Sequence, residues 1–126
     1  MAARTLVLYC DNSIREILSR AIREFAHAAY PVGGSECAQV ARYTLLNVAD
    51  AIDAAIESNA GEVPVSRRIR PNLKAALDYH FDLIDAASGH GSTRQRELFA
   101  GLLKGEVVNV ADLEAARAAD ISDGAE

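Results

Sequence analysis

The most distinctive pattern in the chain is a long segment, residues 36–57, in which polar side chains occupy only one narrow arc of a helix. At about 100° per residue the polar arc spans roughly 140°, which leaves a wider apolar face than an ordinary surface helix has. The arc consists of Glu36, Gln39, Arg42, Asn47, Asp50, Asp53 and Glu57. We therefore expect neighbours on two or more sides of this helix, at the centre of a helical domain or at a subunit interface.

Three other segments have the i, i+3, i+4 periodicity of amphipathic helices. Helix 36–57 is the second helix in chain order. The first helix follows cap residues at 11–13 and ends at Pro31, and the third runs from about residue 72 to 87, after Pro71. The inner face of the third is predicted to hold Leu73, Ala76, Leu77, His80, Ile84 and Ala87. The fourth follows the loop 89–91, where Ser92 and Gln95 have capping-box spacing. A short C-terminal helix is predicted after Asn109.

Residues 5–9, 62–65 and 106–110 have strand-like composition. A lone strand cannot satisfy its backbone, so any strand among them needs a partner within the chain or in a second copy. We favour a helical start to the first helix for residues 5–9, with a strand as the alternative.

These patterns predict an all-α, or nearly all-α, fold. Four main helices and a short C-terminal helix would pack as a small bundle around helix 36–57. With 126 residues the chain suits one domain, residues 1–120, followed by a frayed acidic tail, 121–126. No apolar run approaches the ~18 residues that span a bilayer, and two isolated cysteines are typical of a reducing compartment. We expect a cytoplasmic protein without a membrane partner, metal or cofactor.

Charge is unevenly distributed along the acidic chain. The net formal charge of −5 divides into −3 for residues 1–66, +3 for residues 67–104 and −5 for residues 105–126. An acidic protein has no general attraction for nucleic acid, but a local basic patch can still bind phosphate groups. The basic middle segment is where such a patch would lie.

Two groups of residues in that segment are candidate anion ligands. One is the arginine cluster Arg67, Arg68 and Arg70, and the other is the helix start that holds Ser92, Thr93, Arg94 and Arg96. Together their five arginines suggest, as an alternative function, a small phosphate- or nucleic-acid-binding domain. Because adjacent antiparallel helices begin at opposite ends, we do not expect the two groups to form one patch.

Two histidines raise the question of catalysis. His80 is a titratable group on an apolar helix face, so a third hypothesis is a helical enzyme centred on it. His27 follows Ala26 and is itself followed by Gly33. This segment resembles the Ala-His-x-x-Lys-Gly segment of histidine phosphotransfer domains. Tyr30 stands where that family has lysine, and the next residue is a helix-breaking proline. We expect His27 to be exposed and His80 to be a structural histidine.

No motif for nucleophilic catalysis or nucleotide binding is present, so the favoured function is non-catalytic. We expect a helical interaction or regulatory protein that contacts another protein, itself, or both, with a homodimer favoured. Tyr43 and Leu46 are the candidate contact residues, because both are large and lie at the edge of the polar arc.

Overall fold

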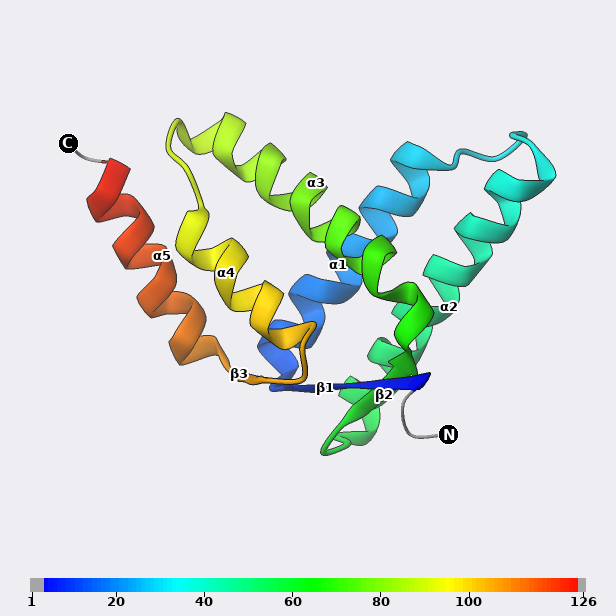
Figure 1. The fold of residues 1–126 in the computed structure, drawn as a ribbon, viewed down its shortest axis with the longest axis horizontal. Coiled ribbons are helices and arrows are strands. Elements are labelled where there is room, and N and C mark those ends of the chain that lie inside the picture. Colours follow the sequence, from blue (N-terminus) through cyan, green and yellow to red (C-terminus); the bar gives the residue numbers. More distant parts are fainter. Residues whose placement is uncertain (1–3, 125–126) are drawn as a thin grey trace.

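The computed structural model describes residues 4–124, in which five α-helices pack with a small three-stranded sheet, all but the end of α2 on one side of it (Figure 1). The predicted predominance of helix is confirmed, and the sheet is an addition to it. In chain order the elements are β1 (Thr5–Cys10), α1 (Asn12–Ala29), α2 (Glu36–Ser58), β2 (Val63–Ser66), the 3₁₀ helix η2 (Arg67–Ile69), α3 (Arg70–Ser88), α4 (Thr93–Leu102), β3 (Val107–Val108) and α5 (Val110–Gly124).

Residues 5–9 belong to a strand, so the expectation of a helical start there is wrong. In the strand order β2-β1-β3, β1 is antiparallel to β2 and parallel to β3. Leu6 and Leu8 of β1 point into the core, whereas Thr5 and Tyr9 are exposed, which is the period of two of a half-buried strand. Partners from two distant segments satisfy the backbone of β1, and local periodicity does not reveal them.

The turn between β1 and α1 holds a carboxylate that serves two helices. Oδ1 of Asp11 accepts a hydrogen bond from the backbone N–H of Ile14 at 3.1 Å, and its Oδ2 accepts one from the N–H of Val110 at 2.8 Å. A negative charge is favourable at a helix N-terminus, where backbone donors lack partners. Asp11 therefore caps α1 and the first residue of α5 together.

The central helix is α1, which packs against both α2 and α3, whereas α2 packs mainly against α1 and β2 (Figure 1). The expectation that the other helices surround residues 36–57 is therefore wrong. Part of the polar arc of α2 also faces α1, because Asp53 accepts hydrogen bonds from Ser19 at 2.6 Å and Arg23 at 2.5 Å. These polar contacts use one flank of α2 and leave its outward face uncovered.

A buried arginine on α1 completes the end of α2. Arg15 is only 2% exposed, and its guanidinium donates to the carbonyl oxygens of Ala55 at 3.3 Å and Ala60 at 2.5 Å. The last carbonyls of a helix have no partners within it and carry its negative dipole end, so a cation is favourable there. Asn59, with a φ of 52°, ends α2 in the left-handed conformation.

Two faces of α3 are buried, because this helix contacts α1 and α4. The inner face predicted from the sequence omits Phe81, which is 2% exposed and packs on Phe99 of α4 with ring centroids 5.5 Å apart. Ala87, which was included in that face, is exposed.

The start of α4 is capped by a residue of α5 rather than by its own sequence. Asp120 accepts hydrogen bonds from the backbone N–H groups of Arg94 at 2.8 Å and Gln95 at 3.1 Å. The predicted capping box is therefore wrong: Ser92 makes no capping hydrogen bond with its side chain, and the amide of Gln95 donates to Asp120 instead. Helix α5 continues to Gly124, through part of the predicted tail, and residues 125–126 lie outside the described range.

Candidate functional site

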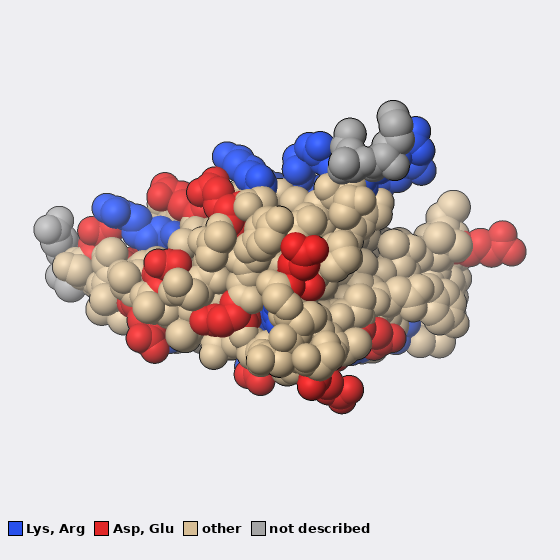
Figure 2. Space-filling model, turned by 90° about the horizontal axis from the view of Figure 1, so that it is seen from below, with Lys and Arg blue, Asp and Glu red and all other residues tan. Residues whose placement is uncertain are grey.

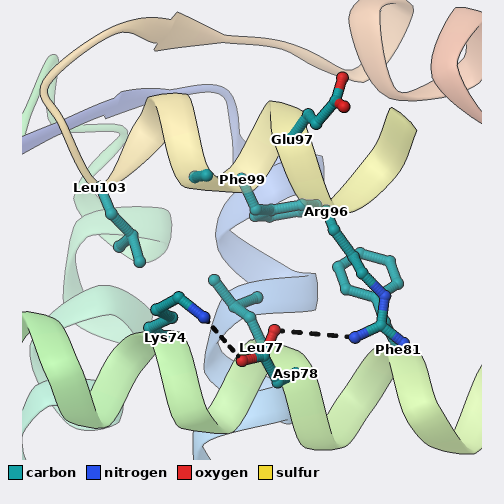
Figure 3. Close-up of a pocket in the computed structure, with 9 residues that line it drawn as sticks. Lys74, Leu77, Asp78, Phe81, Arg96, Glu97, Phe99 and Leu103 are labelled. Carbon is teal, nitrogen blue, oxygen red and sulfur yellow. Dashed lines mark hydrogen bonds and ion pairs between the residues drawn. The ribbon is translucent and has the colours of Figure 1, made fainter. Parts of the chain in front are cut away.

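Within residues 4–124, the most clearly formed concave feature is a groove between α3 and α4. It consists of two adjoining cavities of about 300 and 310 Å³, which share Lys74, Ala100 and Leu103. The first cavity is also lined by Leu77, Asp78, Phe81, Arg96, Glu97 and Phe99, and the second by Arg70, Pro71 and Lys104. We call this feature the α3–α4 groove, and Figure 3 shows the residues that line its first cavity.

Apolar side chains from both helices form the floor of the groove. Leu77 and Phe81 are four residues apart on α3, as are Phe99 and Leu103 at the end of α4, so each pair projects from one helix face. All four are at most 4% exposed. Ala100, beside them, is exposed and leaves room above the floor for a side chain from outside. The floor is therefore rigidly packed, while the space over it is open.

One end of the groove is closed by ion pairs. The guanidinium of Arg96 lies 2.8 Å from Asp82, 2.9 Å from Asp85 and 3.7 Å from Asp78, all on α3. Its carbon Cζ also lies 5.8 Å from the ring centroid of Phe81. Burial lowers the pKa of Arg96, but the hydrogen bonds that its guanidinium donates to Asp82 and Asp85 outweigh that effect and hold the pKa above its ordinary value. These contacts tie α4 to α3 and fix the width of the groove.

The other end of the groove is open and basic. Arg70, Lys74 and Lys104 surround the second cavity. Nζ of Lys74 bonds to Asp78 at 3.0 Å, but its side chain remains 71% exposed. Within residues 4–124, Arg70 and Lys104 have no ion-pair partner. Because their aliphatic stems also line the cavity, these side chains offer apolar contact with a positive charge at the rim.

The five arginines predicted as anion ligands do not come together. Arg70 lies at the groove, and Arg67 and Arg68 line a separate hollow with Arg4. Arg94 pairs with Asp123 at 3.6 Å, and Arg96 is bound to the aspartates of α3. Both arginines belong to the first turn of α4, and the start of α4 lies at the end opposite the start of α3 (Figure 1). The expected separation of the two helix starts is thus observed.

At the start of α4 an internal carboxylate takes the place of a bound anion. Burial raises the pKa of Asp120, but hydrogen bonds from Arg94 and Gln95 outweigh it, so the net effect is a pKa below the ordinary value. Ser92 is buried and accepts a hydrogen bond from Nε of Arg96 at 3.1 Å, whereas Thr93 is exposed. The free N–H groups that would bind an external anion are therefore already used.

His80 is half-buried and contacts Phe81 edge-on, with ring centroids 5.2 Å apart. Burial lowers its pKa, and the neighbouring charge of Glu24 opposes that shift, while Arg20 adds to it. His80 lines neither cavity of the α3–α4 groove. His27 is exposed, as predicted, at the rim of a shallow hollow on α1. Neither histidine is placed in a site where it could act on a substrate held in the groove.

The two predicted contact residues of α2 have different surroundings. Tyr43 is 63% exposed, but Leu46 is half-buried and packs against the core. Val40, one turn before Tyr43, is 65% exposed and was missed in the sequence. Its spacing of three residues from Tyr43 and seven from Asn47 was the signal that could have identified it.

Among residues 4–124, no group of three or more histidine, cysteine or acidic side chains is placed to hold a metal ion. None of the helices in that range is long and apolar enough to cross a membrane. The thiols of Cys10 and Cys37 are both free. Comparisons with protein-family models, with curated proteins and with solved structures find no match to this chain.

Proposed function

We propose that this chain is a non-catalytic interaction protein that binds an acidic amphipathic helix of a partner protein in the α3–α4 groove. The observation that carries the proposal is the combination of an apolar floor and a basic rim in two adjoining cavities. Helix-in-groove recognition uses apolar anchors at i, i+3 or i+4 and i+7, which fill successive hollows along a groove. Two cavities side by side match two such anchors.

Size and charge argue for this occupant over a small-molecule substrate. Each cavity is at the lower end of the ~300–1,000 Å³ that small-molecule sites occupy, and each is open to solvent on one side. Arg70, Lys74 and Lys104 lie around one mouth, so a partner with acidic residues flanking its apolar anchors gains charge complementarity there. A basic partner would be repelled at the same place.

A binding experiment with two synthetic peptides tests the proposal. Both would be 18-residue helices with leucine at positions i, i+4, i+7 and i+11, and one would carry glutamate and the other lysine on the flanks. We expect the glutamate peptide to shift NMR resonances of Ala100 and Leu103, and the lysine peptide to leave them unchanged. Perturbations confined to other surfaces would contradict a role for the groove.

Variants separate the groove from the general charge of the protein. In Lys74→Glu/Lys104→Glu we expect binding to weaken by about tenfold or more, since rim charges that attract become charges that repel. The control Arg20→Glu/Arg117→Glu makes the same change in net charge at exposed positions on α1 and α5. Ala100→Trp, which fills the open space, should abolish binding. Equal weakening by the control would show that no specific groove is involved.

We propose that a second copy of the chain pairs with the outward face of α2. Val40, Tyr43, Asn47, Ala51 and Ala54 are exposed, uncharged and spaced as one stripe. In an antiparallel pair centred on Asn47, Tyr43 would lie opposite Ala51 of the other copy and Val40 opposite its Ala54, so large side chains meet small ones. This reciprocity favours self-association over a different partner.

Light scattering tests that pairing. We expect a dimer for the unmodified chain and a monomer for Tyr43→Lys, because two buried lysines at the pair would lack partners. Leu83→Lys, at an exposed apolar position on α3, is the control and should leave the mass unchanged. A monomeric unmodified chain at high concentration would refute self-association and leave the groove proposal intact.

A further inference from the structure

Three arginines from two distant segments meet at the end of the sheet. Arg4, Ser66, Arg67 and Arg68 line a hollow of about 410 Å³. In the antiparallel ladder Thr5 pairs with Ser66, so Arg4 and Arg67 are one position beyond the last pair. The pairing of β1 with β2 is therefore what brings these cations together.

Positive charges gathered around one hollow favour the binding of an anion there. Like charges placed opposite each other across strands repel, and no acidic side chain lines this hollow. Arg4 and Arg68 make no ion pair within the described part of the chain. In Figure 2, Lys and Arg side chains lie along the upper edge of the face shown, and acidic side chains lie beside them towards the left and are scattered over the rest of that face.

We propose that Arg4, Arg67 and Arg68 form a binding site for a small polyphosphate, the class that includes inorganic diphosphate, triphosphate and the phosphate tails of nucleotides. Guanidinium groups match phosphate oxygens with paired, planar hydrogen bonds. Three of them around one hollow can neutralise several phosphate charges at once. This site is separate from the α3–α4 groove and does not depend on the function proposed for it.

The walls of the hollow favour phosphate groups over bases. Its lining consists of arginines and one serine, with no aromatic side chain on which a base could stack. The hydroxyl of Ser66 already accepts a hydrogen bond from the backbone N–H of Arg68 at 3.3 Å, which leaves its own hydrogen free to donate to a phosphate oxygen. The chain as a whole is acidic, so attraction must act at short range and weaken with added salt.

Calorimetric titration with inorganic triphosphate, with orthophosphate and adenosine triphosphate as comparison ligands, tests the proposal. We expect triphosphate to bind more tightly than orthophosphate, and adenosine triphosphate to bind about as tightly as triphosphate. Equal affinities for triphosphate and orthophosphate, or no binding of triphosphate at low salt, would overturn the proposal.

Variants locate the site. Arg4→Gln/Arg68→Gln should weaken triphosphate binding by about tenfold or more, because charge-assisted hydrogen bonds to two guanidinium groups are lost. Arg20→Gln/Arg117→Gln removes the same charge elsewhere and should change affinity less than about twofold. A circular dichroism melt checks that both variants are folded. Equal weakening in the two variants would refute a defined site.

A ten-residue oligothymidylate distinguishes a small ligand from a nucleic acid. We expect it to bind no more tightly than triphosphate, since the hollow offers no surface for bases. Tighter binding with the same dependence on Arg4 and Arg68 would replace the small-ligand proposal with a nucleic-acid one.

Discussion

The helix pairs α1–α2 and α4–α5 are joined by the same kind of charged contact, but their apolar contacts are very different. Each pair is antiparallel (Figure 1). Each also places one buried charged side chain at an end of the partner helix. Arg15 of α1 binds carbonyls at the C-terminal end of α2, and Asp120 of α5 binds N–H groups at the N-terminal end of α4. In both cases the sign of the charge complements the helix dipole.

The apolar contacts of the two pairs differ. Leu18 and Ile22 of α1, together with Leu45 and Ile52 of α2, are fully buried. On α5 the only buried apolar side chain is Leu113, and this helix packs chiefly on α4. Because local opening costs least where few apolar contacts are lost, α5 should open without the rest of the molecule. In the α1–α2 pair the charged contact adds to an apolar core. In the α4–α5 pair it takes the place of most of such a core.

The strongest test of the comparison is Arg15→Met, which keeps most of the apolar stem and removes the donors. We expect the free energy of unfolding to fall by about 3 kcal/mol, because the charge-assisted hydrogen bonds of Arg15 to the carbonyl oxygens of Ala55 and Ala60 are lost. Urea denaturation followed by circular dichroism measures the loss. Arg20→Met, at an exposed position of the same helix, is the control. A loss below about 1 kcal/mol would mean that the apolar contacts alone hold α1 to α2.

Asp120→Asn tests the weaker pair. We expect a loss of about 1–2 kcal/mol, restricted to α5 and the first turn of α4, because a capping charge disappears while an amide oxygen remains. Hydrogen exchange should accelerate in α5 and remain unchanged in α1. Asp123→Asn, at an exposed site, should have little effect on either. Faster exchange throughout the molecule would show that α5 is part of the global folding unit.

The same contact should respond to acid. Since the folded-state pKa of Asp120 is below its ordinary value of 3.8, the contact stabilises the folded state fully above about pH 5. That contribution is lost as the pH falls through 3.8 towards the lower folded-state pKa. Exchange in α5, corrected for intrinsic rates, should therefore increase relative to α1 on acidification. Asp120→Asn should remove this difference, and an unchanged profile would argue against the contact.

The smallest effect is expected for Arg23→Gln. Arg23 pairs with Asp50 at 2.8 Å and Asp53 at 2.5 Å, but its side chain is 36% exposed and solvent screens the pairs. We expect a loss of at most about 1 kcal/mol in urea denaturation, as is usual for surface ion pairs. A loss comparable to that of Arg15→Met would show that the main polar contribution to the stability of the α1–α2 pair comes from its surface ion pairs.

The features predicted correctly from the sequence are those that depend on near neighbours. The cap residues expected at 11–13 include Asp11, which caps α1, and the expected loop 89–91 begins with Gly89, which ends α3 with a φ of 80°. Periodicity also located the amphipathic face of α1, since its spacing is a property of one helix. These signals identify helices, but they do not state which helices become neighbours.

Features that require distant partners were not predicted. Asp120 caps α4 through N–H groups that lie 25 and 26 residues before it, and Phe81 is buried because α4 covers a second face of α3. The α3–α4 groove depends on the same arrangement, although the i, i+4 pairs on each helix could have suggested apolar faces. The hollow at Arg4 and Arg67 depends on the register of β1 with β2, which one-dimensional patterns do not determine.

The parallel pairing of β1 with β3 also bears on how the chain is made. Tyr9 pairs with Val107, so the central strand is synthesised 98 residues before its second neighbour. At ~5–20 residues per second, a ribosome takes roughly 5–20 s to cover that distance. During this interval β1 has an open edge and Asp11 has no contact with Val110. Completion of the sheet therefore waits for the synthesis of β3, and the nascent chain is most open to edge-to-edge aggregation before that point.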